Sequence, residues 1–264
     1  MYATTAIQAA RLAGKVILDN LGHISKKDIG LKQASDFVTR VDRESERIII
    51  STIKERFPNH HFLAEESAKE TGEGRCRWII DPLDGTTNYI HGYPVFSVSI
   101  ALELNKEIVL GVVFDPLKDE LFHAAKGKGA FLNNHPVKIS TGTDLKDGLI
   151  TTGFPFRKKA LIDPYLRLFQ NIFLKVSDLR RAGSAALDLA YLACGRCEGF
   201  FEIGLSPWDI AAGEILIKEA GGIVTDFSGG PDYLLTGNIV AGIPGIHKEL
   251  LKEIEKVFAG VIDK

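Results

Sequence analysis

The sequence predicts a protein of mixed class, α+β in its first part and α/β in its second, and three observations support this. Two apolar segments with helical spacing open the chain. Four β-rich runs then follow one another, which is typical of an antiparallel sheet. From about residue 140, short apolar runs alternate with helical patterns, which favours an α/β arrangement. We therefore expect two regions, 1–140 and 141–264, within one compact unit.

The composition indicates an ordinary globular protein. With 264 residues, 45% hydrophobic and 25% charged, the chain can bury a full core. Its formal net charge of −2 gives no basic surface of the kind that nucleic-acid binding requires. No segment reaches the roughly 18 uncharged apolar residues of a membrane span, and the N-terminus lacks the apolar region of a signal peptide. We expect a cytoplasmic protein, without membrane or nucleic-acid partners.

The first region is predicted to begin with two helices. Apolar residues at helical spacing predict an amphipathic helix over residues 2–21 and a second helix of about four turns after a polar connection. Asp42 stands where the N-cap of the second helix is expected, which gives this acid a structural explanation. Asp36 precedes that cap and is not explained by it.

The strands of the first region follow from short apolar runs. The run 61–64 predicts a buried strand that leads into Glu65 and Glu66. Neighbouring side chains on an extended chain point opposite ways, so at most one of these two acids should face a given site. The other predicted strands are 77–80, 95–104, 107–114, 120–124 and about 129–132, and Asp81 lies at the end of the first of these. A tight hairpin at Asn105-Lys106 is expected to join 95–104 to 107–114, and a hairpin turn at 126–129 is expected to precede the last strand.

The second region alternates in type. The predicted strands are 149–152, 200–203, 223–226 and 238–241, and the predicted helices are 163–173, 184–193, 208–220 and 246–258. Asp209 lies at the start of one of these helices. Ser206-Pro207-Trp208-Asp209 is also an ordinary helix start, with an N-cap serine, a proline at the first position and an acid at the third.

Six acids at the ends of predicted elements are candidates for a metal site: Asp36, Glu65, Glu66, Asp81, Asp84 and Asp209. Mg²⁺ prefers oxygen ligands in octahedral geometry, and two such ions can activate water and stabilise the leaving oxygen in phosphoryl transfer. The stretch from Asp81 to Asn88 adds a glycine and two threonines to two carboxylates. After Gly85, it resembles a helix start whose backbone N–H groups can hold phosphate oxygens.

The spacing of the two central acids distinguishes between phosphatase mechanisms. Phosphatases that form an aspartyl-phosphate use D-x-D-x-T, whereas here Asp81 and Asp84 form D-x-x-D-G-T. The extra residue changes the geometry of the pair, so direct attack by metal-bound water is favoured over a covalent intermediate. The hydroxyl of Thr86 is placed to orient such a water.

These segments resemble the inositol monophosphatase family, within the superfamily that also contains fructose-1,6-bisphosphatases. Asp81-Pro82-Leu83-Asp84-Gly85-Thr86-Thr87-Asn88-Tyr89 is similar to its first signature, and Trp208-Asp209-Ile210-Ala211-Ala212-Gly213 to its second. The segments 36–42 and 65–67 match its other acidic motifs in order. The resemblance covers roughly residues 5–260, and Ser206-Pro207 is closer to bacterial members.

The resemblance implies a layered α/β/α/β/α sandwich of the sugar-phosphatase type and a Mg²⁺-dependent inositol-phosphate phosphatase, usually homodimeric and often inhibited by Li⁺. It implies two or three Mg²⁺ ions per site. The implied ligands are Glu65, Asp81 and the Leu83 carbonyl for the first ion, Asp81, Asp84 and Asp209 for the second, and Glu65 for a weaker third. Asp36 is implied to orient Thr86, and the two residues together are implied to help deprotonate the attacking water. Glu66 is implied to contact the metal ligands without binding a metal itself.

The resemblance also implies substrate contacts. The implied contacts are the Gly85 and Thr86 amides and Asp84 and Asp209 near phosphate, Glu202 on a substrate hydroxyl, and the backbone of Gly183, Ser184 and Ala185. An acid at Glu202 accepts hydrogen bonds from a polyol and repels a second phosphate, which favours inositol 1-phosphate or a similar polyol monophosphate over a bisphosphate.

Alternatives remain open. Basic clusters at 157–159 and 180–181 could bind a second phosphate, as in hydrolysis of fructose 1,6-bisphosphate or adenosine 3′,5′-bisphosphate, although a solvated surface is the simpler expectation for 157–159. A macromolecular binding role in addition to catalysis is the alternative from a different class. The set of acids argues against a pure scaffold, because carboxylates without a metal repel one another.

Overall fold

The computed structural model describes residues 1–24, 29–33, 36–67, 74–142 and 144–262, with the backbone alone for 31–33 and 36–37. The helices are α1 (Tyr2–Asn20), α2 (Arg40–Arg56), α3 (Thr86–Ile90), α4 (Ile162–Phe173), α5 (Ala185–Ala193), α6 (Pro207–Glu219), α7 (Tyr233–Thr236) and α8 (Pro244–Phe258). Short 3-10 turns lie at Leu145–Asp147 and Lys159–Leu161.

Within the described residues, the strands form three sheets. They are β1 (Ile29–Gln33), β2 (Asp36–Thr39), β3 (His61–Ala64), β4 (Cys76–Asp84), β5 (Ser97–Leu104), β6 (Glu107–Asp115), β7 (Glu120–Ala125), β8 (Ala130–Leu132), β9 (His135–Val137), β10 (Leu149–Thr152), β11 (Asp178–Arg180), β12 (Gly199–Glu202), β13 (Ile223–Thr225) and β14 (Ile239–Gly242). The orders are β1-β2, β3-β4-β5-β6-β7-β8-β9 and β11-β10-β12-β14-β13.

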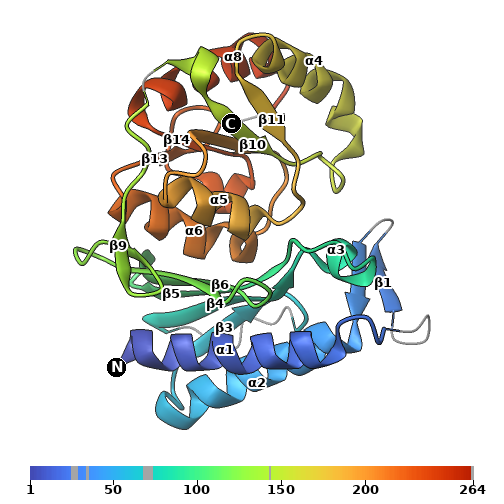
Figure 1. Ribbon diagram of the computed structural model, residues 1–264, viewed down its shortest axis with the longest axis vertical. Helices are drawn as coiled ribbons and strands as arrows, with labels where there is room; N and C mark the ends of the chain where they lie inside the picture. The colour runs from blue at the N-terminus through green and yellow to red at the C-terminus, as the bar shows by residue number, and fades with distance from the viewer. Residues whose placement is uncertain (25–28, 34–35, 68–73, 143, 263–264) are drawn as a thin grey trace.

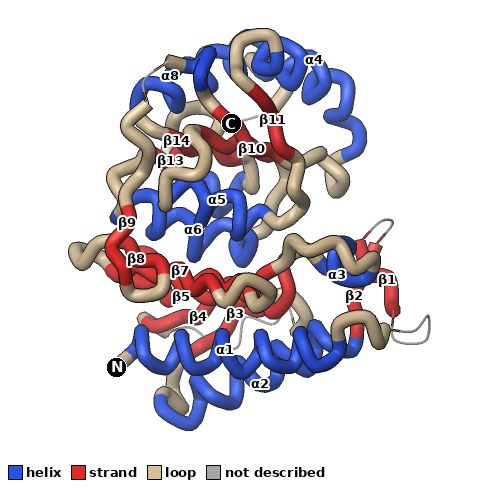
Figure 2. The backbone as a smooth tube through the Cα atoms, in the orientation of Figure 1, coloured by secondary structure: helices blue, strands red, loops and turns tan. Residues whose placement is uncertain are grey.

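These elements stack in five layers (Figures 1 and 2). The pair α1 and α2 covers one face of the seven-stranded sheet, and α5 and α6 lie between that sheet and the five-stranded sheet. The pair α4 and α8 covers the outer face of the five-stranded sheet. The expected class and the α/β/α/β/α sandwich are therefore confirmed.

Burial on both faces explains the composition of the central strands. Residues 97–102 of β5 are all buried, because helices cover the seven-stranded sheet from both sides. Helix α6 is buried around its circumference, and residues 209–217, which include the acids Asp209 and Glu214, are all buried between the two sheets. Gly111 of β6 permits this approach, since a Cβ atom there would lie 2.5 Å from the carbonyl oxygen of Ala212.

Several local predictions are confirmed. Asn105 and Lys106 have positive φ angles and join β5 to β6 in a two-residue hairpin. The turn at 126–129 also connects antiparallel strands, as expected, and its backbone N–H groups from 127 to 129 donate to the carboxylate of Glu219. The anion that this turn holds is therefore a side chain of the same protein.

Two predictions of element boundaries are wrong. The N-cap of α2 is Thr39, and Asp42 lies at the third helical position, where its carboxylate accepts the Thr39 N–H at 2.8 Å. The strand predicted to end at Asp81 continues to Asp84. A register shift within β4 permits this continuation.

The length and apolar character of the helices bear on whether any of them could span a membrane. Among those in the part of the chain that the structure describes, none combines the length and the apolar character needed to cross a bilayer.

Candidate active site

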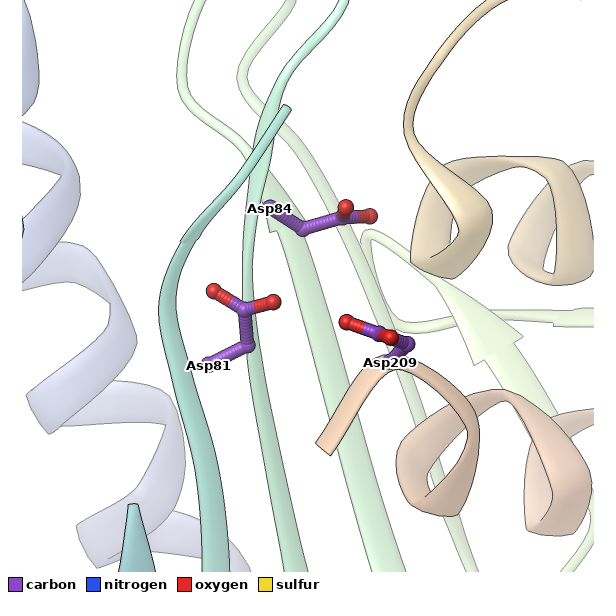
Figure 3. A group of neighbouring side chains, drawn as sticks. All are labelled: Asp81, Asp84 and Asp209. Atoms are coloured by element: carbon purple, nitrogen blue, oxygen red, sulfur yellow. The ribbon is translucent and has the colours of Figure 1, made fainter. Parts of the chain in front are cut away.

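Three aspartates from two layers meet beside the seven-stranded sheet. Asp81 and Asp84 lie on β4, and Asp209 lies in the first turn of α6. One carboxylate oxygen of each lies within 4.8 Å of one from each of the others. Figure 3 shows the three side chains turned toward a common space. The structure thus brings together acids separated by more than 120 residues in the sequence.

A bulge in β4 explains why Asp81 and Asp84 share a face. Residues three apart on a regular strand point to opposite sides of a sheet. Here Asp81 pairs with Ser99 and Asp84 with Ser97, so three steps along β4 match two along β5. The additional residue restores a common side. Pro82 fits within the irregularity because it has no N–H to donate to a ladder.

Backbone N–H groups anchor each aspartate. Asp81 Oδ1 accepts the Leu83 N–H at 3.0 Å, and Asp209 Oδ2 accepts the Ser206 N–H at 2.7 Å. Asp84 Oδ2 accepts the Ala186 N–H at 2.8 Å and the Ser184 hydroxyl at 2.6 Å, both at the start of α5. These bonds fix the carboxylates in place before any ligand is bound.

The concentration of negative charge is visible in the pKa values. Burial, then the charges of Glu65, Asp84 and Asp209, raises the pKa of Asp81 well above its usual range, and a hydrogen bond joins its side chain to that of Glu65. Burial, followed by the charge of Asp209, raises the pKa of Asp84 to about 7. A cluster of oxygen ligands that share protons in this way fits a hard divalent cation, which would replace those protons.

Thr86 links this cluster to α2. Its Oγ1 lies 2.8 Å from Asp42 Oδ1 and 3.0 Å from the carbonyl oxygen of Leu83. The family resemblance implies that Asp36 orients Thr86, but the side chain of Asp36 lies outside the described residues. Sequence reasoning missed Asp42 as a site residue, although the spacing of Thr39 and Asp42 fits a capping box that would turn this acid inward.

A cavity of about 280 Å³ opens beside the carboxylates. The predicted residues on its wall are Glu65, Asp81, Leu83, Asp84, Gly85, Thr86, Gly183, Ser184, Ala185, Glu202 and Asp209. Glu66 is not on this wall; its backbone N–H donates to Glu46 Oε2 at 2.7 Å, which ties the turn after β3 to α2. Gly85 begins α3 with a φ of +92°, and a Cβ there would lie 2.8 Å from the Val95 carbonyl oxygen.

Glu202 enters the cavity from β12. Its side chain is nearly buried, and a Cβ atom at Gly153 would lie 2.0 Å from Glu202 Oε1, so a larger residue there would displace the carboxylate. Burial and the charge of Asp209 raise the pKa of Glu202 to about 8, against the opposing effect of Arg181. Near neutral pH this carboxyl therefore carries a proton for much of the time and can both donate and accept hydrogen bonds.

Two further residues were missed or misplaced by the sequence analysis. Arg157, expected on a solvated surface, lines the cavity, and its Nη1 lies 3.0 Å from Asp209 Oδ2. Asp188 of α5 is buried, and its pKa is raised by burial and by the charge of Glu202. No local pattern identifies either residue, since both positions depend on contacts between distant segments.

Comparison with known proteins gives consistent results. A model of the inositol monophosphatase family matches residues 2–258. A relative from Escherichia coli named Nus factor SuhB is 49% identical over 247 residues, 93% of this chain and 92% of that protein. An inositol-1-monophosphatase from Mesorhizobium japonicum is 45% identical over 251 residues, 95% and 94% of the two chains.

A solved structure is also similar. The crystal structure of the extragenic suppressor protein suhB from Bartonella henselae superposes with a TM-score of 0.93 at 42% identity. The match covers 96% of this chain and 98% of that one. The arrangement of layers described above is therefore shared along almost the whole length of both chains.

We predict that the protein without divalent cations loses stability as pH rises from about 5 to about 9. The pKa of Glu202 is raised from 4.5 to about 8 and that of Asp84 from 3.8 to about 7. The folded state therefore holds more protons than the unfolded state across this window, and its advantage disappears as pH passes the raised values. Urea unfolding in EDTA measures the effect.

The variant Glu202→Gln is the control, because it removes one titrating group and should flatten the upper part of the decline. Addition of Mg²⁺ should restore stability at the alkaline end. Stability that increases with pH across the window in EDTA would contradict this account of the site.

Proposed function

The chain belongs to the inositol monophosphatase family, and from that premise we propose that it is a Mg²⁺-dependent phosphomonoesterase that hydrolyses inositol 1-phosphate or a similar polyol monophosphate. We propose attack by water without a phosphoenzyme. The observation that carries the proposal is the convergence of three anchored aspartates on one cavity, where the pKa values of Asp81 and Asp84 are raised.

We propose the metal ligands as follows. Glu65, Asp81 and the Leu83 carbonyl hold one Mg²⁺, and Asp81, Asp84 and Asp209 hold a second, while Glu65 can serve a weaker third. When bound, these ions supply Lewis-acid stabilisation of the phosphoryl group and lower the pKa of water. The donor set supports this choice, because every proposed side-chain ligand is a carboxylate, which suits a hard cation.

The protein's own contribution to water attack centres on Thr86. Its hydroxyl donates to Asp42 or to the Leu83 carbonyl, which leaves the oxygen lone pairs to accept a hydrogen bond from a water in the cavity. Asp42 is 0% exposed and is itself held by the N–H and hydroxyl of Thr39. We propose that Asp42, rather than Asp36, orients Thr86 and favours removal of the water's proton.

Glu202 supports a polyol as the rest of the substrate. Its carboxyl faces the cavity with a pKa of about 8, so it can bind a hydroxyl as donor or as acceptor. Gly183, Ser184 and Ala185 line the adjoining wall, and the Ser184 hydroxyl is committed to Asp84. Arg157 and Arg181 line the same cavity, and their guanidinium groups could bind a second phosphate, so a bisphosphate is the alternative substrate.

A macromolecular role in addition to catalysis is the second candidate. The observation that favours it is the 49% identity to a relative named as a Nus factor. With a net charge of −2, a protein partner is favoured over direct binding of nucleic acid. We also propose that the protein is cytoplasmic.

We also propose a homodimer. Helix α4 and the residue that follows it carry an exposed apolar stripe, at Ile162, Leu166, Phe173 and Leu174, which supports burial against another copy. Light scattering that gives the mass of a single chain at micromolar concentration would overturn this proposal. We also expect Li⁺ to inhibit the enzyme, as the family resemblance implies.

A substrate panel with Mg²⁺ tests the proposed function. We expect inositol 1-phosphate to be hydrolysed in preference to fructose 1,6-bisphosphate and adenosine 3′,5′-bisphosphate. Asp81→Asn and Asp209→Asn should each lower the Mg²⁺-dependent rate at least about 100-fold while the protein stays folded, because charge stabilisation at the phosphoryl group is lost. Asp119→Asn, which changes an exposed acid, is the matched control. Preference for a bisphosphate would overturn the assignment of Glu202, and full activity of Asp81→Asn would overturn the metal site.

Substitution of Thr86 tests the proposed attack. Thr86→Ala should lower kcat by a factor of about 100 or more with little change in KM, since the hydroxyl acts on water rather than on substrate binding. Thr86→Ser retains the hydroxyl and should recover much of the rate. Asp42→Asn should lower kcat in the same direction. A raised KM with normal kcat in Thr86→Ala would assign this residue to binding instead.

Affinity purification separates the second candidate from the first. We expect that an Asp84→Asn variant, which is catalytically silent, still retains any protein partner that the wild type retains, because the partner surface is distinct from the cavity. Partners that are lost together with activity, or the absence of any stoichiometric partner, would count against a separate binding role.

A further inference from the structure

Arg157 reaches into the cavity and contacts two of the proposed metal ligands. Its Nη1 lies 3.0 Å from Asp209 Oδ2, and its Nη2 lies 3.8 Å from Glu65 Oε1. The guanidinium also lies over the ring of Phe156, 4.8 Å from its centroid. The side chain is 22% exposed, so these contacts are made largely away from bulk water, where charge interactions are stronger.

The contacts of Arg157 are not those of an exposed surface pair. Asp209 and Glu65 belong to different layers, because Asp209 begins α6 and Glu65 follows β3. A guanidinium between them neutralises part of the charge that their approach concentrates. Its position within the acidic cluster therefore makes it a counter-cation of the site.

Two neighbouring cations, Arg181 and Lys158, make different contacts. Arg181 lines the same cavity, but its charge lowers the pKa of Glu202 and that of Asp188, neither of which is a proposed metal ligand. The Lys158 ammonium is exposed and donates to the carbonyl oxygen of Thr236 at 3.4 Å. Among these three, Arg157 is the one whose contacts are with proposed metal ligands.

A divalent cation and this guanidinium compete for the same acids. Ligand distances for Mg²⁺ are about 2.1 Å, so an ion on Asp209 would lie within roughly 5 Å of a donor that is 3.0 Å from the same carboxylate. Like charges at that separation repel in a partly buried site. Either the metal binds more weakly or the arginine moves away.

We propose that Arg157 is an internal counter-cation that competes with the divalent metal for Asp209 and Glu65, and so raises the metal concentration that the site requires. The inference rests on the proposed function, because it takes the acidic cluster as the metal site. Arg157 leaves the carboxylates when the metal enters and then faces the cavity, where a phosphate group can accept its N–H groups.

Calorimetric titration with Mn²⁺ in the absence of substrate tests this inference. Arg157→Gln should bind the ion about three- to tenfold more tightly than wild type, because one partly buried ion pair no longer has to be broken. Arg181→Gln is the matched control: it removes the same charge from the same cavity without removing a contact to a proposed metal ligand. Its affinity should change by less than about twofold.

Thermal unfolding provides a second readout that does not depend on activity. In EDTA, Arg157→Gln should unfold at a lower temperature than wild type, because the carboxylates have lost a counter-charge. In saturating Mg²⁺ the two proteins should unfold at the same temperature. Arg181→Gln should not show this difference between conditions.

The outcomes separate the two proposals. Unchanged or weaker Mn²⁺ affinity in Arg157→Gln, with normal binding by wild type, would overturn the inference and leave the proposed function intact. A wild-type protein that binds no divalent cation would overturn both.

Discussion

Asp81, Asp84 and Asp209 each place a carboxylate oxygen within 4.8 Å of the other two, in a region where little water reaches them. Like charges at this distance repel one another strongly in a medium of low polarity. The backbone must therefore hold them together, and it does so in one recurrent way. Each carboxylate accepts a nearby backbone N–H: that of Leu83, of Ala186 at the start of α5, or of Ser206 at the start of α6. Burial, and after it the charges of the neighbouring acids, raises the pKa values of Asp81 and Asp84.

This constraint connects the site to the whole fold. The first two acids lie on the seven-stranded sheet, whereas Asp209 belongs to a helix that is buried on every side between both sheets. The third layer is thus fixed in position by packing, with Gly111 allowing β6 to approach the backbone of α6. A small shift of the seven-stranded sheet relative to α6 would therefore separate the carboxylates of Asp81 and Asp84 from that of Asp209. The stability of the core that contains α5 and α6 between the two sheets offsets the cost of concentrating charge at its edge.

Much of this architecture could be predicted from sequence because it depends on local patterns. Apolar spacing located most helices and strands, and the position of acids at the ends of elements identified Asp81, Asp84 and Asp209. The remainder depends on contacts between distant segments. The bulge that turns Asp84 toward Asp81 exists only in the pairing of β4 with β5. Arg157 looked like part of an exposed basic cluster, and its inward position follows from the acids that it meets. The raised pKa of Glu202 likewise comes from burial, which no local pattern determines.

Asp42 and Asp209 show why a structural explanation for a residue does not exclude a functional one. Both occupy the third position of a helix and accept the N–H of the residue that precedes the helix, so both stabilise a helix start. A capping box also removes rotational freedom from the acid and fixes the direction of its second oxygen. Asp42 uses that second oxygen to hold the Thr86 hydroxyl at 2.8 Å. A catalytic group gains from such prior ordering, because the protein does not have to reorganise during the reaction. Helix capping is therefore part of how this site is built.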